Sequence, residues 1–272
     1  MSKPTPVAVL DFGTNTSRLL ITDGESLDVR THRITGLGRG LSASGQLSKE
    51  GISRVLEAIE EFNLLIAQHE VETIRAVTTS AARDARNRDD FIGAASASLN
   101  HPLELLSGEE EARYGFLGAT ADLDRTAAPF LVVDIGGGST EFSLGTDVAE
   151  MYRSVDMGSV RFFEKFLLND PPKPEELSAA IQVARLHLDD IDRELPLIGK
   201  ANSLVGVAGT ITTIAAVEIG LEPYDPEVID GFRLTRQAAE DVFRTLATAV
   251  SYTHLRAHET SLHLVCRLLL EK

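Results

Sequence analysis

The stretch Phe130-Leu-Val-Val-Asp134-Ile-Gly136-Gly137-Gly138-Ser139-Thr140-Glu141 decides the fold, because a second stretch has the same design: Val7-Ala-Val-Leu-Asp11-Phe-Gly13-Thr14-Asn15-Thr16. Each is an apolar, β-prone run followed by Asp-x-Gly and then by small hydroxyl residues. A single Asp-x-Gly is typical of an ordinary hairpin turn. Two of them, one extended to Gly-Gly-Gly-Ser-Thr-Glu, predict an anion-binding hairpin in each of two similar lobes.

The residue types in these turns suit phosphate. Glycine lets the backbone turn with positive φ and approach a ligand closely. Successive backbone N–H groups in such a turn form a concave nest that binds anions, and hydroxyl groups add donors. Asp11 and Asp134 follow apolar runs, where a carboxylate can hold a hydrated divalent cation. The expected cofactor is therefore Mg²⁺, with Mn²⁺ as the alternative.

Composition limits the classes of function. The 272 residues are enough for two domains, and 43% are hydrophobic, so both should have cores. The net charge of −15 argues against broad nucleic-acid binding, and a polyanionic substrate would need arginines, backbone nests and a cation at its site. No apolar run approaches the ~20 residues of a membrane span. The N-terminus lacks the basic-then-apolar pattern of a signal peptide, and the chain has a single cysteine. Both features favour a cytoplasmic location without a membrane partner.

Hydrophobic patterning predicts the order β-β-β-α-β-α twice, which indicates a duplicated α/β lobe with a cleft between the copies. Residues 1–125 would form the first lobe and residues 126–250 the second. Ser48 is predicted to cap the long helix that follows it. The predicted strands are 7–10, 17–23, 27–34, 73–77, 103–106, 130–134, 140–144, 149–155 and 204–208, and the predicted helices begin near residues 48, 89, 107, 159, 175 and 209.

Five motifs carry a resemblance to a known family: Asp11-Phe-Gly-Thr-Asn-Thr-Ser-Arg18, Thr79-Ser-Ala-Ala-Arg83, Ser107-Gly-Glu-Glu-Glu-Ala-Arg113, Asp134-Ile-Gly-Gly-Gly-Ser-Thr-Glu141 and Val207-Ala-Gly-Thr-Ile-Thr-Thr213. Over roughly residues 5–249 the chain resembles the exopolyphosphatase / guanosine pentaphosphate phosphohydrolase family, most of all its short actinobacterial members. The resemblance implies an α/β fold of two actin-like, ribonuclease-H-like lobes with the active site in the cleft between them.

The resemblance also implies roles for single residues. Glu111 matches the family's proposed catalytic glutamate and would be the general base that activates water. Glu141 would position the water or the metal, and Arg83 would contact substrate phosphate. The alternatives are that Glu111 only stabilises a helix start, that Glu141 is a solvated charge, and that Arg83 forms a surface ion pair with Asp84 or Asp89.

The expected substrate-binding residues are those of the two turns and of the Val207–Thr213 motif. Arg18 is included, although a structural role is favoured for it. The last motif corresponds to a loop that approaches adenosine in nucleotide-binding relatives, and here it either binds a nucleotide or only lines the same region. The full set is Gly13, Thr14, Asn15, Arg18, Gly136, Gly137, Gly138, Ser139, Gly209 and Thr210, with Asp134 and Asp11 as the metal ligands.

The predicted function is Mg²⁺-dependent hydrolysis of terminal phosphate from inorganic polyphosphate. The nearest alternative substrate is guanosine pentaphosphate (pppGpp). An ATP-dependent phosphotransferase and a non-catalytic polyphosphate or nucleotide sensor remain more distant alternatives. The family also suggests a homodimer.

The tail departs from the family pattern. Residues 251–272 contain three of the seven histidines and the only cysteine. His254, His258, His263 and Cys266 allow a zinc site as one interpretation. The preferred interpretation is an atypical, artefactual ending that replaces the native C-terminus, with a cost in stability and solubility.

Overall fold

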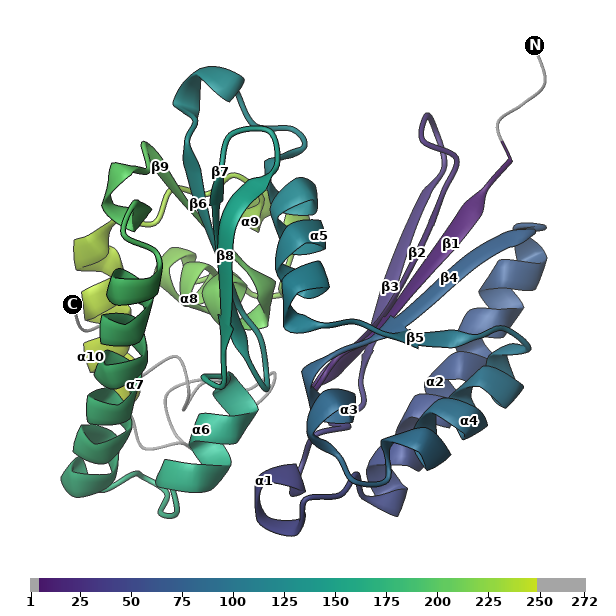
Figure 1. Cartoon of the computed structure of the whole chain (residues 1–272), viewed down its shortest axis with the longest axis horizontal. Helices are drawn as coiled ribbons and strands as arrows, with labels where there is room; N and C mark the ends of the chain where they lie inside the picture. Colours follow the sequence, from purple (N-terminus) through teal and green to yellow (C-terminus); the bar gives the residue numbers. More distant parts are fainter. Residues whose placement is uncertain (1–4, 249–272) are drawn as a thin grey trace. The chain divides into compact units, whose positions relative to one another are not determined.

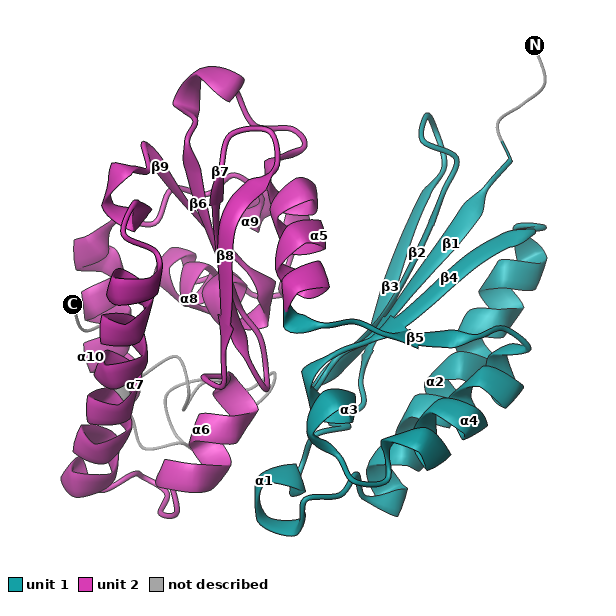
Figure 2. Cartoon of the chain, viewed as in Figure 1, with its two compact units in different colours: residues 1–108 teal, residues 109–272 magenta. Residues whose placement is uncertain are grey.

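The computed structural model describes residues 5–248, and its helices and strands are labelled in Figure 1. The chain divides into two compact units, residues 1–108 and residues 109–272 (Figure 2). Each unit contains one mixed β-sheet with helices packed against it. The predicted α/β fold with two similar lobes is confirmed, whereas the cleft between the lobes stays a prediction.

Unit 1 has a five-stranded sheet in the order β3-β2-β1-β4-β5. Strands β1 to β3 are antiparallel neighbours, and β4 and β5 continue the sheet in parallel with β1. The strands are β1 (Val7–Phe12), β2 (Thr16–Thr22), β3 (Asp28–Ile34), β4 (Thr73–Thr78) and β5 (Leu103–Leu105), and the helices are α1 (Leu41–Ser44), α2 (Lys49–Gln68), α3 (Ser80–Asp84) and α4 (Arg88–Leu99).

Helix α2 shows why the sequence folds as it does in unit 1. The Ser48 side chain accepts a hydrogen bond from the backbone N–H of Gly51 at 3.0 Å, which confirms the predicted cap, an interaction worth ~1 kcal/mol. Val55, Ile59 and Phe62 follow at helical spacing and are buried in one core with the sheet and α4. The amphipathic pattern therefore fixes which face of α2 packs on the sheet.

Unit 2 has a four-stranded sheet in the order β8-β7-β6-β9, with β6 to β8 antiparallel and β9 parallel to β6. This strand order and these strand directions match those of β3-β2-β1-β4 in the unit 1 sheet. The strands are β6 (Phe130–Ile135), β7 (Thr140–Gly145), β8 (Ala149–Val155) and β9 (Ser203–Val207); the helices are α5 (Gly108–Thr120), α6 (Ser159–Phe166), α7 (Pro174–Glu194), α8 (Ala208–Ile219), α9 (Pro226–Ile229) and α10 (Arg236–Thr248), with short 3₁₀ turns η1 (Arg125–Ala127) and η2 (Ile198–Lys200).

The two faces of the unit 2 sheet carry different helices. On one face, Phe142 of β7 shares a core with residues of α6 and α7. On the other face, Phe130 and Val132 of β6 pack against Phe116 of α5. Because side chains alternate along a strand, Asp134 lies on the same face as Phe130 and Val132. The face that packs against α5 is therefore the one that carries the carboxylate.

The boundary between the units differs from the predicted one. The sequence predicts a boundary after residue 125, whereas the chain divides after Gly108, so α5 belongs to unit 2. The physical reason is the side chain of Phe116, which is fully buried against β6. Burial of a phenylalanine contributes ~1.5–3 kcal/mol, and it attaches α5 to the sheet that follows it in sequence.

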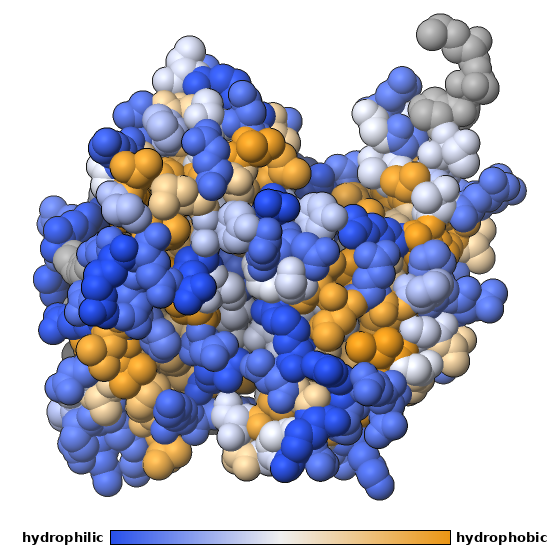
Figure 3. Space-filling view, in the orientation of Figure 1, coloured by the Kyte–Doolittle hydropathy of each residue, from blue (hydrophilic) through white to orange (hydrophobic). Residues whose placement is uncertain are grey.

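The face in Figure 3 is mainly hydrophilic with separate hydrophobic patches, in keeping with the strongly negative net charge.

Among residues 5–248 no helix has the length and hydropathy to cross a membrane. The predicted atypical ending at residues 251–272, and with it the zinc interpretation, lies outside the described residues.

Candidate active site

The two glycine turns have the same local structure. In unit 2 the N–H of Gly136 donates to the carbonyl oxygen of Ser139 at 3.0 Å. In unit 1 the N–H of Gly13 donates to the carbonyl oxygen of Thr16 at the same distance. The predicted residues of both turns therefore occupy equivalent positions in equivalent hairpins, namely Gly13, Thr14 and Asn15 in unit 1 and Gly136, Gly137, Gly138 and Ser139 in unit 2.

Strand register places residues of opposite charge across from the aspartate in the two hairpins. In unit 1, Asp11 lies directly across from Arg18, and the two side chains form an ion pair of 3.1 Å. In unit 2, Asp134 lies directly across from Glu141. Like charges at directly opposed positions repel each other. Unit 1 thus neutralises its own carboxylate, whereas unit 2 holds two acidic groups side by side.

A third carboxylate comes from α5. The hydroxyl of Ser143 on β7 donates to the carbonyl oxygen of Ala112 at 3.1 Å, which joins the first turns of α5 to the sheet. Glu111 precedes Ala112 and is half-buried. Asp134 also lies near this helix, since a Cβ added at Gly115 would be 3.7 Å from its Oδ2. The start of α5 therefore carries Glu111 to the face that bears Asp134.

Glu109 holds α5 in place and is not one of the three clustered carboxylates, Glu111, Asp134 and Glu141. It forms an ion pair with Arg113 at 3.3 Å and a hydrogen bond with the Tyr152 hydroxyl. The Arg113 guanidinium also lies 5.3 Å from the centre of the Tyr152 ring. These contacts fix the start of α5 against β8, which gives Glu109 a structural role.

The electrostatics of Glu141 follow from this arrangement. Its side chain is only 3% exposed, so the alternative of a solvated strand-end charge does not hold. Burial, followed by the negative charges of Glu111 and Asp134, raises the pKa of Glu141 to about 8. The Ser154 hydroxyl, 2.7 Å from Glu141 Oε1, and the Ser139 side chain oppose that rise. At neutral pH the proton on Glu141 or a nearby cation must balance the charge of this group.

The donor set fits a hard divalent cation. Within residues 5–248, no group of three or more His, Cys, Asp or Glu side chains is arranged to hold a metal ion. Mg²⁺ is commonly bound through one or two carboxylates, with water and substrate phosphate completing the octahedron. Asp134 and Glu141, which lie directly opposite each other on β6 and β7, provide such a pair.

Thr14 and Arg83, two further predicted residues of unit 1, are each held by a hydrogen bond. Thr14 is buried, and its carbonyl oxygen accepts a hydrogen bond from the N–H of Gly38 at 2.8 Å. Arg83 is half-buried on α3, and its Nη1 donates to the carbonyl oxygen of Leu106 at 2.9 Å. Asp89, one of the two partners considered for Arg83, pairs with Arg88 at 3.7 Å.

The Val207–Thr213 motif forms the junction between β9 and α8. Thr210 is 1% exposed, and the Thr213 hydroxyl donates to the carbonyl oxygen of Gly209 at 2.7 Å. Ala208 has a φ of 70°, a conformation that L-residues with a Cβ seldom adopt. The motif is therefore a strained helix start, and its binding role stays a prediction.

A profile of the Ppx/GppA phosphatase family matches residues 22–262. The chain belongs to this family. It is 39% identical to Exopolyphosphatase 2 of Mycobacterium tuberculosis over 262 residues, which cover 92% of this chain and 81% of that protein. It is 33% identical over 239 residues to a guanosine-5'-triphosphate,3'-diphosphate pyrophosphatase of Vibrio vulnificus, covering 84% of this chain and 46% of the other. A crystal structure of an exopolyphosphatase-like protein, 35% identical, superposes with a TM-score of 0.90 over 98% of this chain and 86% of that one.

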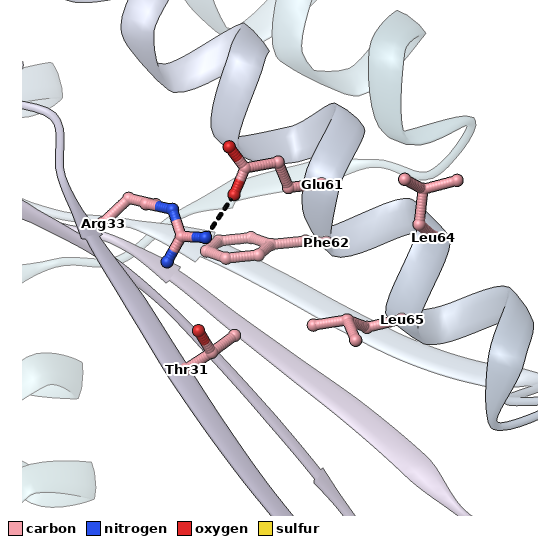
Figure 4. Close-up of a pocket in the computed structure, with 6 residues that line it drawn as sticks. All are labelled: Thr31, Arg33, Glu61, Phe62, Leu64 and Leu65. Carbon is pink, nitrogen blue, oxygen red and sulfur yellow. Dashed lines mark ion pairs between the residues drawn. The ribbon is translucent and has the colours of Figure 1, made fainter.

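A pocket lies elsewhere in unit 1 and contains none of the residues that carry the family motifs. It has a volume of about 230 Å³ and opens between β3 and α2 (Figure 4). Arg33 and Glu61 form an ion pair of 2.6 Å at its edge, and Leu65 lines its apolar side. The pocket of this Ppx/GppA family member lies in unit 1, whereas the carboxylates Glu111, Asp134 and Glu141 lie in unit 2.

Sequence reasoning missed several residues that support the site. Ser143, Ser154 and Tyr152 escaped notice because their roles depend on strand register, which pairs Ser154 with Glu141 and Tyr152 with Ser143. Gly158 and Arg161 were also missed. They lie at the start of α6, whose backbone N–H groups donate to the carbonyl oxygens of Gly136 and Gly137, and no local pattern predicts this contact.

Proposed function

We propose that this member of the Ppx/GppA family is an exopolyphosphatase that removes terminal phosphate from inorganic polyphosphate. The observation that carries the proposal is the convergence of Glu111, Asp134 and Glu141 on one face of the unit 2 sheet, beside the Gly136–Ser139 turn. Phosphoryl transfer to water depends on positioning and charge neutralisation, and these residues supply groups for both.

Glu111 is the proposed general base. Its carboxylate would accept a proton from a water molecule as the water oxygen attacks the terminal phosphorus. The bond from that phosphorus to the bridging oxygen would break, releasing orthophosphate and a chain one phosphate shorter. A positioned base of this kind contributes typically ~10²–10⁴-fold to the rate.

The backbone N–H groups of the Gly136–Ser139 turn would bind phosphate oxygens, and Arg83 would add a charged donor. Asp134 and Glu141 are the proposed holders of Mg²⁺ or Mn²⁺, which when bound would neutralise phosphate charge. Asp11, the other predicted ligand, already pairs with Arg18, so its proposed role is to fix the first turn. A homodimer and a cytoplasmic location remain predictions from the sequence.

The alternative substrate is pppGpp, because a relative 33% identical to this chain carries a guanosine-5'-triphosphate,3'-diphosphate pyrophosphatase name. Both substrates present a terminal phosphoanhydride to the same carboxylates. The choice between them therefore depends on the rest of the substrate and not on the reacting phosphate.

The test compares kcat/KM for medium-chain polyphosphate, pppGpp and ATP, each with Mg²⁺, with Mn²⁺ and with a chelator. The proposal predicts the largest kcat/KM for polyphosphate and loss of turnover in the chelator. A larger kcat/KM for pppGpp would show that pppGpp, and not polyphosphate, is the preferred substrate. Phosphate transfer from ATP to an acceptor, or tight binding without turnover by folded protein, would favour the kinase or the sensor.

A further inference from the structure

The carbonyl groups of the Gly136–Gly138 turn all accept hydrogen bonds from the start of α6. The carbonyl oxygen of Gly136 accepts from the N–H of Ser159 at 2.9 Å. The carbonyl oxygen of Gly137 accepts from the N–H groups of Val160 and Arg161 at 2.8 and 3.1 Å. The third carbonyl differs from the first two, because a side chain holds it: Arg161 Nε donates to the oxygen of Gly138 at 2.7 Å.

The direction of these carbonyls fixes the direction of the next N–H groups. In a planar trans peptide the C=O of one residue and the N–H of the next point to opposite sides. With the oxygens of Gly136, Gly137 and Gly138 directed at α6, the N–H groups of Gly137, Gly138 and Ser139 face away from it. Three successive donors on one side form the anion nest that phosphate binding requires.

We propose that Arg161 is a positioning residue for this phosphate turn. Its guanidinium contacts the Gly138–Ser139 peptide on the carbonyl side, opposite to the N–H that would meet a phosphate oxygen. Arg161 therefore acts through the turn and does not bind phosphate itself. The inference rests on the proposed function, because it assumes that phosphate occupies the nest.

The surroundings of Arg161 support a fixed position. Its side chain is 22% exposed, and its Nη2 lies 3.7 Å from Asp156 Oδ1. Gly158 brings the helix close, since a Cβ there would be 2.4 Å from the carbonyl carbon of Gly138. The guanidinium thus lies between an acidic partner and the turn.

The substitutions to test are Arg161→Gln, Arg161→Lys and Arg161→Ala. The matched control is Arg153→Gln, because Arg153 forms an exposed ion pair with Glu194 of α7 and lies on the face of the sheet opposite to Glu141. A misdirected Ser139 N–H loses a hydrogen bond to a charged group, so kcat/KM for polyphosphate should fall ~10–100-fold in Arg161→Gln, with a raised KM. The control should retain wild-type kinetics.

A purely structural role would give a different pattern. Loss of folded protein lowers the apparent kcat and leaves KM unchanged. Positioning by the guanidinium predicts instead that added methylguanidinium restores part of the activity of Arg161→Ala, and that Arg161→Lys recovers only part of it because its ammonium lacks the planar fork. An unchanged KM together with a fall in kcat that follows the folded fraction would overturn the inference.

A binding measurement separates this inference from the proposed function. Imidodiphosphate, a non-hydrolysable phosphate pair, is titrated into protein labelled with ¹⁵N-glycine, and the Gly137 and Gly138 amide signals are followed. The expected result is a Kd raised ~10-fold or more in Arg161→Gln, with the other glycine signals unchanged. That result would uphold the positioning role even if wild-type protein did not hydrolyse polyphosphate. Equal affinity in the two proteins, or no binding at the turn in wild type, would overturn it.

Discussion

Asp134 and Glu141 occupy directly opposed positions on β6 and β7, where the equivalent pair in unit 1 is Asp11 and Arg18. The same hairpin therefore carries an internal ion pair in one unit and two carboxyl groups in the other. Unit 1 presents a turn with an internal ion pair, whereas unit 2 presents a turn with two adjacent carboxyl groups.

The first prediction concerns stability as a function of pH. The pKa of Glu141 is raised to about 8 in the folded protein, against 4.5 for an ordinary glutamate. Between these values the folded state binds more protons than the unfolded state, so the free energy of unfolding falls as pH rises through that window, by at most about 1.4 kcal/mol per pH unit. Glu141→Gln should remove this contribution, as measured by urea denaturation in a chelator at pH 5 to 9.

A matched control for this measurement is Glu150→Gln, which alters an exposed carboxyl on β8. The control should retain the wild-type slope of unfolding free energy against pH. Mg²⁺ should flatten the wild-type slope and leave that of Glu141→Gln unchanged. Equal slopes for wild type and Glu141→Gln would contradict the electrostatic account of the site.

The second prediction transfers the acidic arrangement to unit 1. Arg18→Glu would place a carboxylate opposite Asp11, as Glu141 lies opposite Asp134. The opposed charges should lower the stability of this variant below that of Arg18→Gln by ~0.2–1 kcal/mol in a chelator. Mg²⁺ should reduce the difference. Identical melting temperatures for the two variants in the chelator would show that register does not bring these positions into electrostatic contact.

The third prediction concerns Ser154, whose hydroxyl hydrogen-bonds to Glu141 at 2.7 Å and favours the ionised carboxylate. Ser154→Ala should raise the pKa of Glu141 further. If ionised Glu141 is required for turnover, the acidic limb of the kcat/KM profile should move to higher pH. Ser178→Ala, on an exposed position of α7, is the control. An unchanged profile of kcat/KM against pH in Ser154→Ala would show that ionisation of Glu141 does not determine the pH dependence of turnover.

The fourth prediction tests the close approach of α6 to the glycine turn. A methyl group at Gly158 would lie 2.4 Å from the carbonyl carbon of Gly138 and 2.5 Å from the carbonyl oxygen of Gly137, both of them backbone atoms. Gly158→Ala should therefore cost ~1–3 kcal/mol of stability and should weaken imidodiphosphate binding. Gly199→Ala places its methyl group in open space and should change neither quantity. A Gly158→Ala protein with wild-type stability would contradict the packing.

Local sequence patterns predicted much of the fold. The β-β-β-α-β-α order and the Ser48 cap depend on residues close in sequence, and both are confirmed. The unit boundary depends on the packing of Phe116 against β6, which is a tertiary contact and leaves no local signal. Helix α3 was missed because five residues are too few to show helical periodicity.

The same distinction applies to the site. Glu111, Asp134 and Glu141 lie in motifs, so the sequence singled them out. The roles of Ser154 and Arg161 depend on residues 13 and 23 positions away, which strand register and the return of α6 bring near. Such contacts follow from the fold, and the motifs contain no sign of them.

The most direct test of the central claim is phosphate release from medium-chain polyphosphate with Mg²⁺ by wild type, Glu111→Gln and Glu110→Gln. Glu110 is an exposed neighbour on the same helical turn, so it controls for the loss of one charge. The account predicts a rate at least ~100-fold lower for Glu111→Gln and a rate near wild type for Glu110→Gln. Equal release by wild type and Glu111→Gln would contradict the assignment of Glu111 as the base.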